Sequence, residues 1–217
     1  MDYKFLKERH RAERSEFPQG LSVRVHRALS WLKRSEQESE DQDAKFLFLW
    51  IAFNSAYAQE EIGNYSSNER SKQSLYWEKL IGLDDEKRIY NLVWGEFSNS
   101  IRLFKDNHYI FGPFWEFQKG HISEKEWSDK FAKANKKISH ALVTENTLDL
   151  LSLIFDRLYM LRNQLIHGGA TWNGKVNREQ IEVSTKLLAL FVPVMVSIMM
   201  DHPKTLWGDE TFPVVDS

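Results

Sequence analysis

The chain has 217 residues, of which 42% are hydrophobic and 28% are charged, a composition that can bury one substantial core. We therefore expect one domain over residues 1–217. The absence of cysteine excludes disulfides and thiolate metal sites, and the charged N-terminus lacks the apolar segment of a signal peptide. A cytoplasmic location is the expectation. The net charge of −2 excludes a general attraction to nucleic acid, so any contact with RNA has to come from local patches.

Charge is distributed unevenly along the chain. Residues 1–34 contain nine Lys and Arg against four Asp and Glu, whereas residues 36–43 contain five acids and no base. The basic segment could face a polyanion, or it could form the solvated face of an amphipathic helix. Both interpretations stay open at the level of sequence.

Apolar residues at helical spacing predict a series of helices and an all-α fold. The first follows Pro18, and the second is so apolar that it should be buried nearly all round. Residues 63–68 have turn chemistry, and the two helical runs after them are interpreted as peripheral. The predicted helices cover residues 21–32, 44–58, 69–81, 84–105, 124–142, 146–167 and 178–200.

The last predicted helix contains an apolar run of 14 residues, 187–200, interrupted by Pro193 and Ser197. This run falls short of the roughly 20 residues that span a bilayer. We therefore interpret it as a buried or interfacial helix and expect no contact with a membrane.

Two further patterns could contact RNA. Residues 109–117, YIFGPFWEF, place five aromatic rings around a Gly-Pro break, and exposed rings can stack on unpaired bases. Such clusters more often pin a loop to the core, which is the interpretation we favour. Lys130, Lys133 and Lys137 form a line on helix 124–142 that is either a basic strip or a solvated face.

The helix over residues 146–167 carries an arginine in its packing seam. Leucines and a phenylalanine recur there at spacings of three and four, and Arg162 replaces an apolar residue in this stripe. A charge in such a seam must find a partner or line a cleft or an interface, because burying it alone is costly. A neighbouring polar stripe contains Asp156, Tyr159, Asn163 and His167.

The end of this helix is predicted from glycine. Gly168 and Gly169 can supply the left-handed conformation that stops a helix, which places His167 in the last turn. There the negative end of the helix dipole favours an imidazolium. Basic residues in a last turn followed by glycine are also ordinary C-capping chemistry, so this simpler interpretation remains an alternative.

The arrangement R-x-x-x-x-H, here Arg162, Asn163 and His167, resembles the signature of the HEPN superfamily of helical nucleotide- and RNA-binding domains. The segments LWIAFNSAY (49–57) and LRNQLIHGGATWNGKVNREQ (161–180) are similar to one bacterial branch of it. The resemblance implies a HEPN-like up-and-down helical bundle with peripheral helices. It also implies a metal-independent endoribonuclease that acts as a toxin or defence effector with an antitoxin or other partner.

The resemblance assigns roles to the motif. His167 would act as acid and base, Arg162 would bind the phosphate, and Asn163 would orient them. Further candidates to support these residues or to contact RNA are Asn54, Asp156, Tyr159, Lys130, Lys133 and Lys137. Asn54 could equally bond a neighbouring helix without any catalytic duty. Gly169 stands where the branch modified by a partner nucleotidyltransferase usually has tyrosine, which argues against an antitoxin of that kind.

No nucleotide-binding, hydrolase or zinc-protease motif is present, and the seven histidines show no close ligand spacing, so we expect no metal and no cofactor. Cleavage of RNA needs no metal if a base takes the 2′-hydroxyl proton and a cation stabilises the charge at phosphorus. One such site has too few groups for attack and departure together, which favours a homodimer. The alternatives are a non-catalytic RNA- or protein-binding module on the same fold, and a small-molecule regulator with a large apolar pocket.

Overall fold

A computed structural model describes residues 1–57, 68–98, 100–208 and 212. Every regular element within these residues is a helix and none is a strand, so the predicted all-α class is confirmed. The chain divides into two compact units, residues 1–89 with 185–217, and residues 90–184. The prediction of one domain and the HEPN-like arrangement of the helices both stay predictions.

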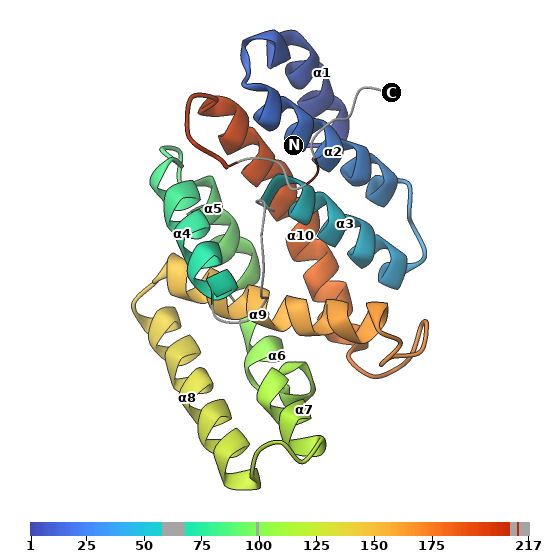
Figure 1. Cartoon of the computed structure of the whole chain (residues 1–217), viewed down its shortest axis with the longest axis vertical. Coiled ribbons are helices and arrows are strands. Elements are labelled where there is room, and N and C mark those ends of the chain that lie inside the picture. The colour runs from blue at the N-terminus through green and yellow to red at the C-terminus, as the bar shows by residue number, and fades with distance from the viewer. Residues whose placement is uncertain (58–67, 99, 209–211, 213–217) are drawn as a thin grey trace. The chain divides into compact units, whose positions relative to one another are not determined.

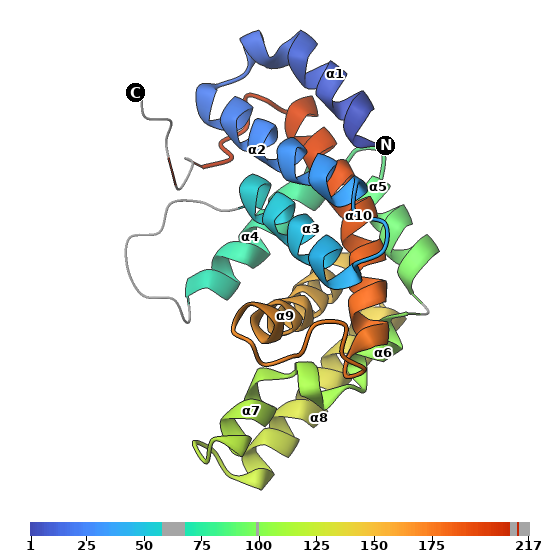
Figure 2. The same ribbon diagram turned by 90° about the vertical axis from the view of Figure 1, so that its right-hand side faces the viewer.

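The first unit is built around a helical pair (Figure 1). Helix α2 lies along α3, and α1 packs on α2 (Figure 2). The unit contains α1 (Tyr3–Glu13), the 3-10 turn η1 (Arg14–Glu16), α2 (Gln19–Glu36), α3 (Gln42–Tyr57), α4 (Asn68–Gly82), the start of α5 (Arg88–Asn91) and most of α10 (Arg178–Asp201). The turn predicted at residues 63–68 lies outside the described residues, except for Asn68, with which α4 begins.

Aromatic packing holds the core of the first unit together. Trp77 of α4 is fully buried, stacks on Phe53 of α3 at 5.6 Å between ring centroids, and meets Phe191 of α10 edge-on at 5.5 Å. Helix α3 is therefore deeply buried, as its apolar sequence predicts. Arg24 of α2 is buried as well and donates to the carbonyl oxygen of Trp207 at 2.6 Å.

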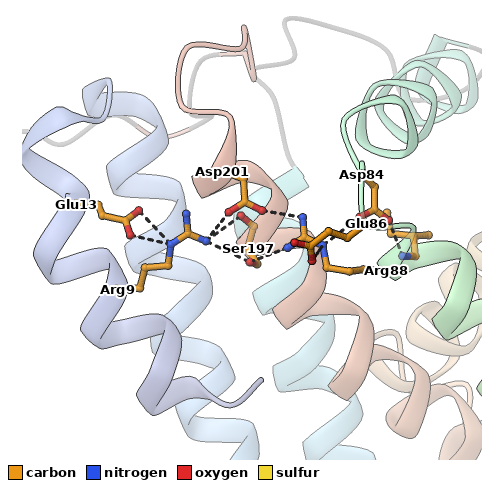
Figure 3. Close-up of polar contacts among 8 residues, drawn as sticks. Arg9, Glu13, Asp84, Glu86, Arg88, Ser197 and Asp201 are labelled. Carbon is orange, nitrogen blue, oxygen red and sulfur yellow. Dashed lines mark hydrogen bonds and ion pairs between the residues drawn. The ribbon is translucent and has the colours of Figure 1, made fainter.

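An ion network joins α1 and α5 to the end of α10 (Figure 3). Asp201 accepts from Nη1 of Arg9 and Nη2 of Arg88, each at 2.7 Å, and both arginines also donate to the Ser197 hydroxyl. Burial alone would raise the pKa of Asp201, but the hydrogen bonds from Arg88 and Arg9 hold it below its ordinary value. The network therefore fastens three helices to one carboxylate.

Helix α10 matches the predicted range of residues 178–200 to within one residue, but its apolar part extends beyond the 14-residue run. By length and composition alone this 24-residue helix could cross a membrane, so the argument from a 14-residue run underestimated it. However, 72% of its apolar window is buried within the structure. This agrees with the prediction of a buried helix and is typical of the core helix of a soluble protein.

The second unit consists of shorter elements followed by two long helices. The π-helical turn η2 (Leu92–Phe97) leads to α6 (Ile101–Lys105), the 3-10 turn η3 (His108–Ile110), α7 (Gly112–Gln118), α8 (Glu124–Val143) and α9 (Thr147–Ile166). Helix α8 packs against both α9 and α7 (Figure 1). The side chains of Ser123 and Asn146 cap the starts of α8 and α9.

The prediction of one continuous helix over residues 84–105 was wrong. The structure has α5, η2 and α6 in its place. Asp84 accepts from the backbone nitrogen of Ile89 at 2.7 Å, which starts the helical segment after the turn at Lys87. The later break falls beside Ser98 and Ser100, a residue type that favours local hydrogen bonds over a helix interior.

Candidate functional site

The C-terminus of α9 has the predicted geometry. Gly168 adopts a left-handed conformation with φ of 69°, and His167 is the C-cap, with its backbone nitrogen donating to the Asn163 carbonyl at 3.0 Å. The nitrogen of Ala170 returns to the Gln164 carbonyl, also at 3.0 Å. These bonds satisfy carbonyls that the helix end would otherwise leave unpaired.

Arg162 lies half-buried in the last turns of α9. Its Nη1 donates to the side-chain oxygen of Asn163 at 2.9 Å. Its Nε is buried and has no hydrogen-bond partner among the described residues, and no carboxylate among them pairs with the guanidinium. The positive charge of Arg162 is therefore held by a neutral amide.

His167 is exposed, and no hydrogen bond among the described residues joins its ring to Arg162. Five residues along a helix correspond to a turn of about 140° and a rise of about 7.5 Å, so the two side chains leave α9 in different directions. Asp156 and Tyr159 are half-buried on the same helix. A side-chain hydrogen bond thus joins Arg162 to Asn163, whereas His167 is joined to Asn163 through the backbone and forms no side-chain hydrogen bond with either residue within the described structure.

A chain of side-chain amides fixes the segment that follows His167. Gln164 donates to the Tyr109 carbonyl at 2.6 Å and accepts from Nδ2 of Asn177 at 2.9 Å. Asn107 donates to the Asn177 side-chain oxygen, also at 2.9 Å. This chain ties α9 to η3 and to the start of α10, and sequence reasoning missed it because the partners are far apart in the sequence.

Arg157 is a second arginine on α9 that sequence reasoning missed. It is only 3% exposed, and its guanidinium lies over the rings of Phe111 at 4.4 Å and Phe131 at 5.7 Å. Burial lowers the pKa of Arg157 to about 10, partly opposed by the charge of Asp156. This enclosed position suits packing between α8 and α9 and gives no access to a substrate.

The aromatic segment 109–117 packs its rings on α8, as a cluster that pins a loop would, although no residue of α7 is buried. Phe114 meets Trp127 of α8 edge-on at 5.3 Å, and Phe117 stacks on the same ring at 6.0 Å. Trp115 donates to the Tyr109 carbonyl at 2.7 Å. Tyr109 itself remains 45% exposed, so one ring of the cluster is open to solvent.

The three lysines predicted to form a strip are all exposed on α8. Lys130 pairs with Glu126 at 2.7 Å, so its charge is balanced one turn away. Neither Lys133 nor Lys137 has an ion pair among the described residues. Asn54 is half-buried on α3 of the first unit, and its supporting role stays a prediction.

No family model, curated protein or solved structure matches the chain. The resemblance to HEPN proteins therefore rests on the motifs in the sequence and stays a prediction. Over the described residues, no group of three His, Asp or Glu side chains is placed to hold a metal ion.

Proposed function

We propose that this chain is a metal-independent endoribonuclease of the HEPN type that acts as a toxin or defence effector. The observation that carries the proposal is that no described carboxylate pairs with the Arg162 guanidinium. This group is bound by the Asn163 amide, so its charge remains available to an external phosphate. The exposed His167 ends the same helix.

These groups match the chemistry of RNA cleavage. A neutral His167 takes the proton of a 2′-hydroxyl, whose oxygen attacks the adjacent phosphorus while the bond to the 5′-oxygen breaks. Arg162 stabilises the added negative charge on the phosphoryl oxygens. The departing 5′-oxygen needs a proton from a second, protonated group, and the product carries a 2′,3′-cyclic phosphate.

The geometry of α9 favours a pair of motifs in the working enzyme. One imidazole cannot be base and acid at the same moment, and Arg162 and His167 leave the helix about 140° apart. A homodimer would supply a second histidine and a second arginine. The hydrogen bond between Gln164 and Asn177 gives the segment after His167 a defined backbone position, which supports a role for His167 in such a paired site.

The second candidate is a non-catalytic RNA-binding module. It is favoured by the absence of a hydrogen bond between His167 and Arg162 within one copy of the chain, and by Lys133 and Lys137 of α8, which are exposed and form no ion pair with any described residue. Such a module would bind RNA through phosphate contacts and would leave it intact.

The products of cleavage separate the two candidates. Purified protein incubated with single-stranded RNA in EDTA should yield fragments with 2′,3′-cyclic phosphate ends, whereas DNA of the same sequence should stay intact because it lacks the nucleophile. Light scattering on the same sample should report a dimer. Equal cleavage of DNA, or activity only after Mg²⁺ is added, would exclude His167 and the 2′-hydroxyl as the reacting pair.

A further inference from the structure

The N-terminal helix carries a row of cations on one face. Lys4, Lys7, Arg11 and Arg14 follow at spacings of three, four and three residues, which places them along one line of α1 and its continuation η1. Lys4, Arg11 and Arg14 are exposed, and Lys7 is half-buried. We call these four residues the α1 stripe. At about 1.5 Å per residue the stripe extends for about 15 Å.

Helix α2 adds two more basic groups beside the α1 stripe. Nζ of Lys7 donates to Nδ1 of His26 at 3.1 Å, so His26 is neutral in this contact and keeps its other ring nitrogen as a donor. The His26 ring is exposed. The neighbouring Arg27 is half-buried and donates to the Phe212 carbonyl at 2.6 Å.

The cations of the α1 stripe form no ion pairs within the part of the chain that the structure describes. Glu13 is engaged by Arg9 on another face of the helix. Glu8 lies one turn from both Lys4 and Arg11 but forms no ion pair within the described structure. The row is therefore a local concentration of positive charge in a chain whose net charge is −2.

Two side chains of this arrangement, Lys7 and His26, have a pKa below the ordinary value. Burial lowers the pKa of Lys7, and the charges of Arg11 and Arg14 lower it further. Burial likewise lowers the pKa of His26, with Lys7, Arg14 and Arg27 adding to the effect. Repulsion of this kind is relieved when an anion binds, because each cation then gains an opposite charge.

We propose that the α1 stripe, together with His26 and Arg27, binds the phosphate backbone of RNA. A straight row of about 15 Å can meet several consecutive phosphates of one nucleic-acid strand. The choice of RNA among polyanions rests on the proposed function. An anionic membrane fits less well, because Phe5, the large apolar side chain of α1 that is exposed, lies about 100° or more around the helix from the members of the α1 stripe, and Leu6 is fully buried.

Binding can be measured without cleavage. The probe is a short single-stranded 2′-O-methyl RNA, which has no free 2′-hydroxyl, labelled for fluorescence anisotropy. The test variant is Lys4→Gln with Arg11→Gln, two exposed substitutions that keep the contact between Lys7 and His26. The matched control is Lys119→Gln with Lys125→Gln, which removes the same charge from exposed side chains of the second unit.

The two lost contacts should weaken binding by a factor of about 10 to 100 at low salt and reduce the slope of log K against log salt by about 1.4. The control should match the wild type. Equal affinity and slope in the test variant, or no binding by the wild type, would overturn the inference. Stripe-dependent binding to phosphatidylserine vesicles with no binding to the RNA would also overturn it. If stripe-dependent RNA binding is found but native RNA is never cut, the inference stands and the ribonuclease proposal fails.

Discussion

The buried His10 should make the first unit less stable as the pH falls from 8 to 5. The side chain is 1% exposed, its Nε2 lies 3.3 Å from the Ser22 hydroxyl, and its Nδ1 has no partner among the described residues. Burial lowers the pKa of His10 to about 4, and the nearby Lys7, His26 and Arg14 oppose a proton as well. The folded protein therefore keeps this ring neutral under mildly acidic conditions.

The direction in which stability changes with pH follows from the number of protons that His10 binds in the folded and unfolded states. In the unfolded chain His10 has an ordinary pKa of about 6.5 and takes up a proton below it, whereas the folded chain does so only below about 4. Between these values the unfolded state binds more protons, so stability falls as the pH falls. At pH 5 the loss relative to pH 8 is about 2 kcal/mol, from about 1.4 kcal/mol per pH unit below 6.5.

The assay is urea unfolding at pH 8 and pH 5 for the wild type and for His10→Gln, whose amide can still bond Ser22 but does not titrate. His26 and Asp201 titrate in both proteins, so the comparison isolates His10. The pH-dependent loss should be smaller by about 2 kcal/mol in the variant. Equal losses in the two proteins, or an NMR titration showing His10 protonated near pH 6.5, would refute the reasoning.

Two further predictions concern the end of α9. Gly168→Ala should destabilise the protein by about 1 to 2 kcal/mol because alanine is strained at φ of 69°, although no atom lies within 4 Å of the added Cβ. The control is Gly82→Ala, where the added Cβ is equally unobstructed and φ is not positive. Equal melting temperatures for the two variants would contradict the argument. Asn177→Ala should raise amide hydrogen exchange across residues 168–177 while α8 stays protected, because it removes the bonds to Gln164 and Asn107; unchanged exchange would show that these bonds do not hold the segment.

Local chemistry made α9 predictable from the sequence. The expected range of 146–167 matches the observed helix with its two caps, since Asn146 and Gly168 act through their own side chain and backbone. By contrast, the sequence did not decide the structure of the segment that forms α1, because His10 counts as polar in a hydrophobic pattern although its side chain is buried. The break within residues 84–105 went unpredicted because its apolar spacing stays helical through the serines.

Contacts between distant segments could not be predicted. The sequence singled out Arg162 because leucines surround it in its stripe, yet Arg157 is the more deeply buried of the two. The rings of Phe111 and Phe131 enclose Arg157, and only the fold brings them to α9. The amide chain through Gln164 has the same origin.

The ribonuclease proposal depends most directly on the rate of RNA cleavage by three single variants. His167→Ala should lower the rate by about 10² to 10⁴ with an unchanged melting temperature, as expected for loss of a general acid or base at an exposed helix end. Arg162→Lys should also be impaired, because lysine keeps the charge but loses the planar fork that holds two phosphate oxygens. His140→Ala, which removes an exposed histidine of α8, should cleave at the wild-type rate. Cleavage by His167→Ala at the wild-type rate would contradict the proposed site.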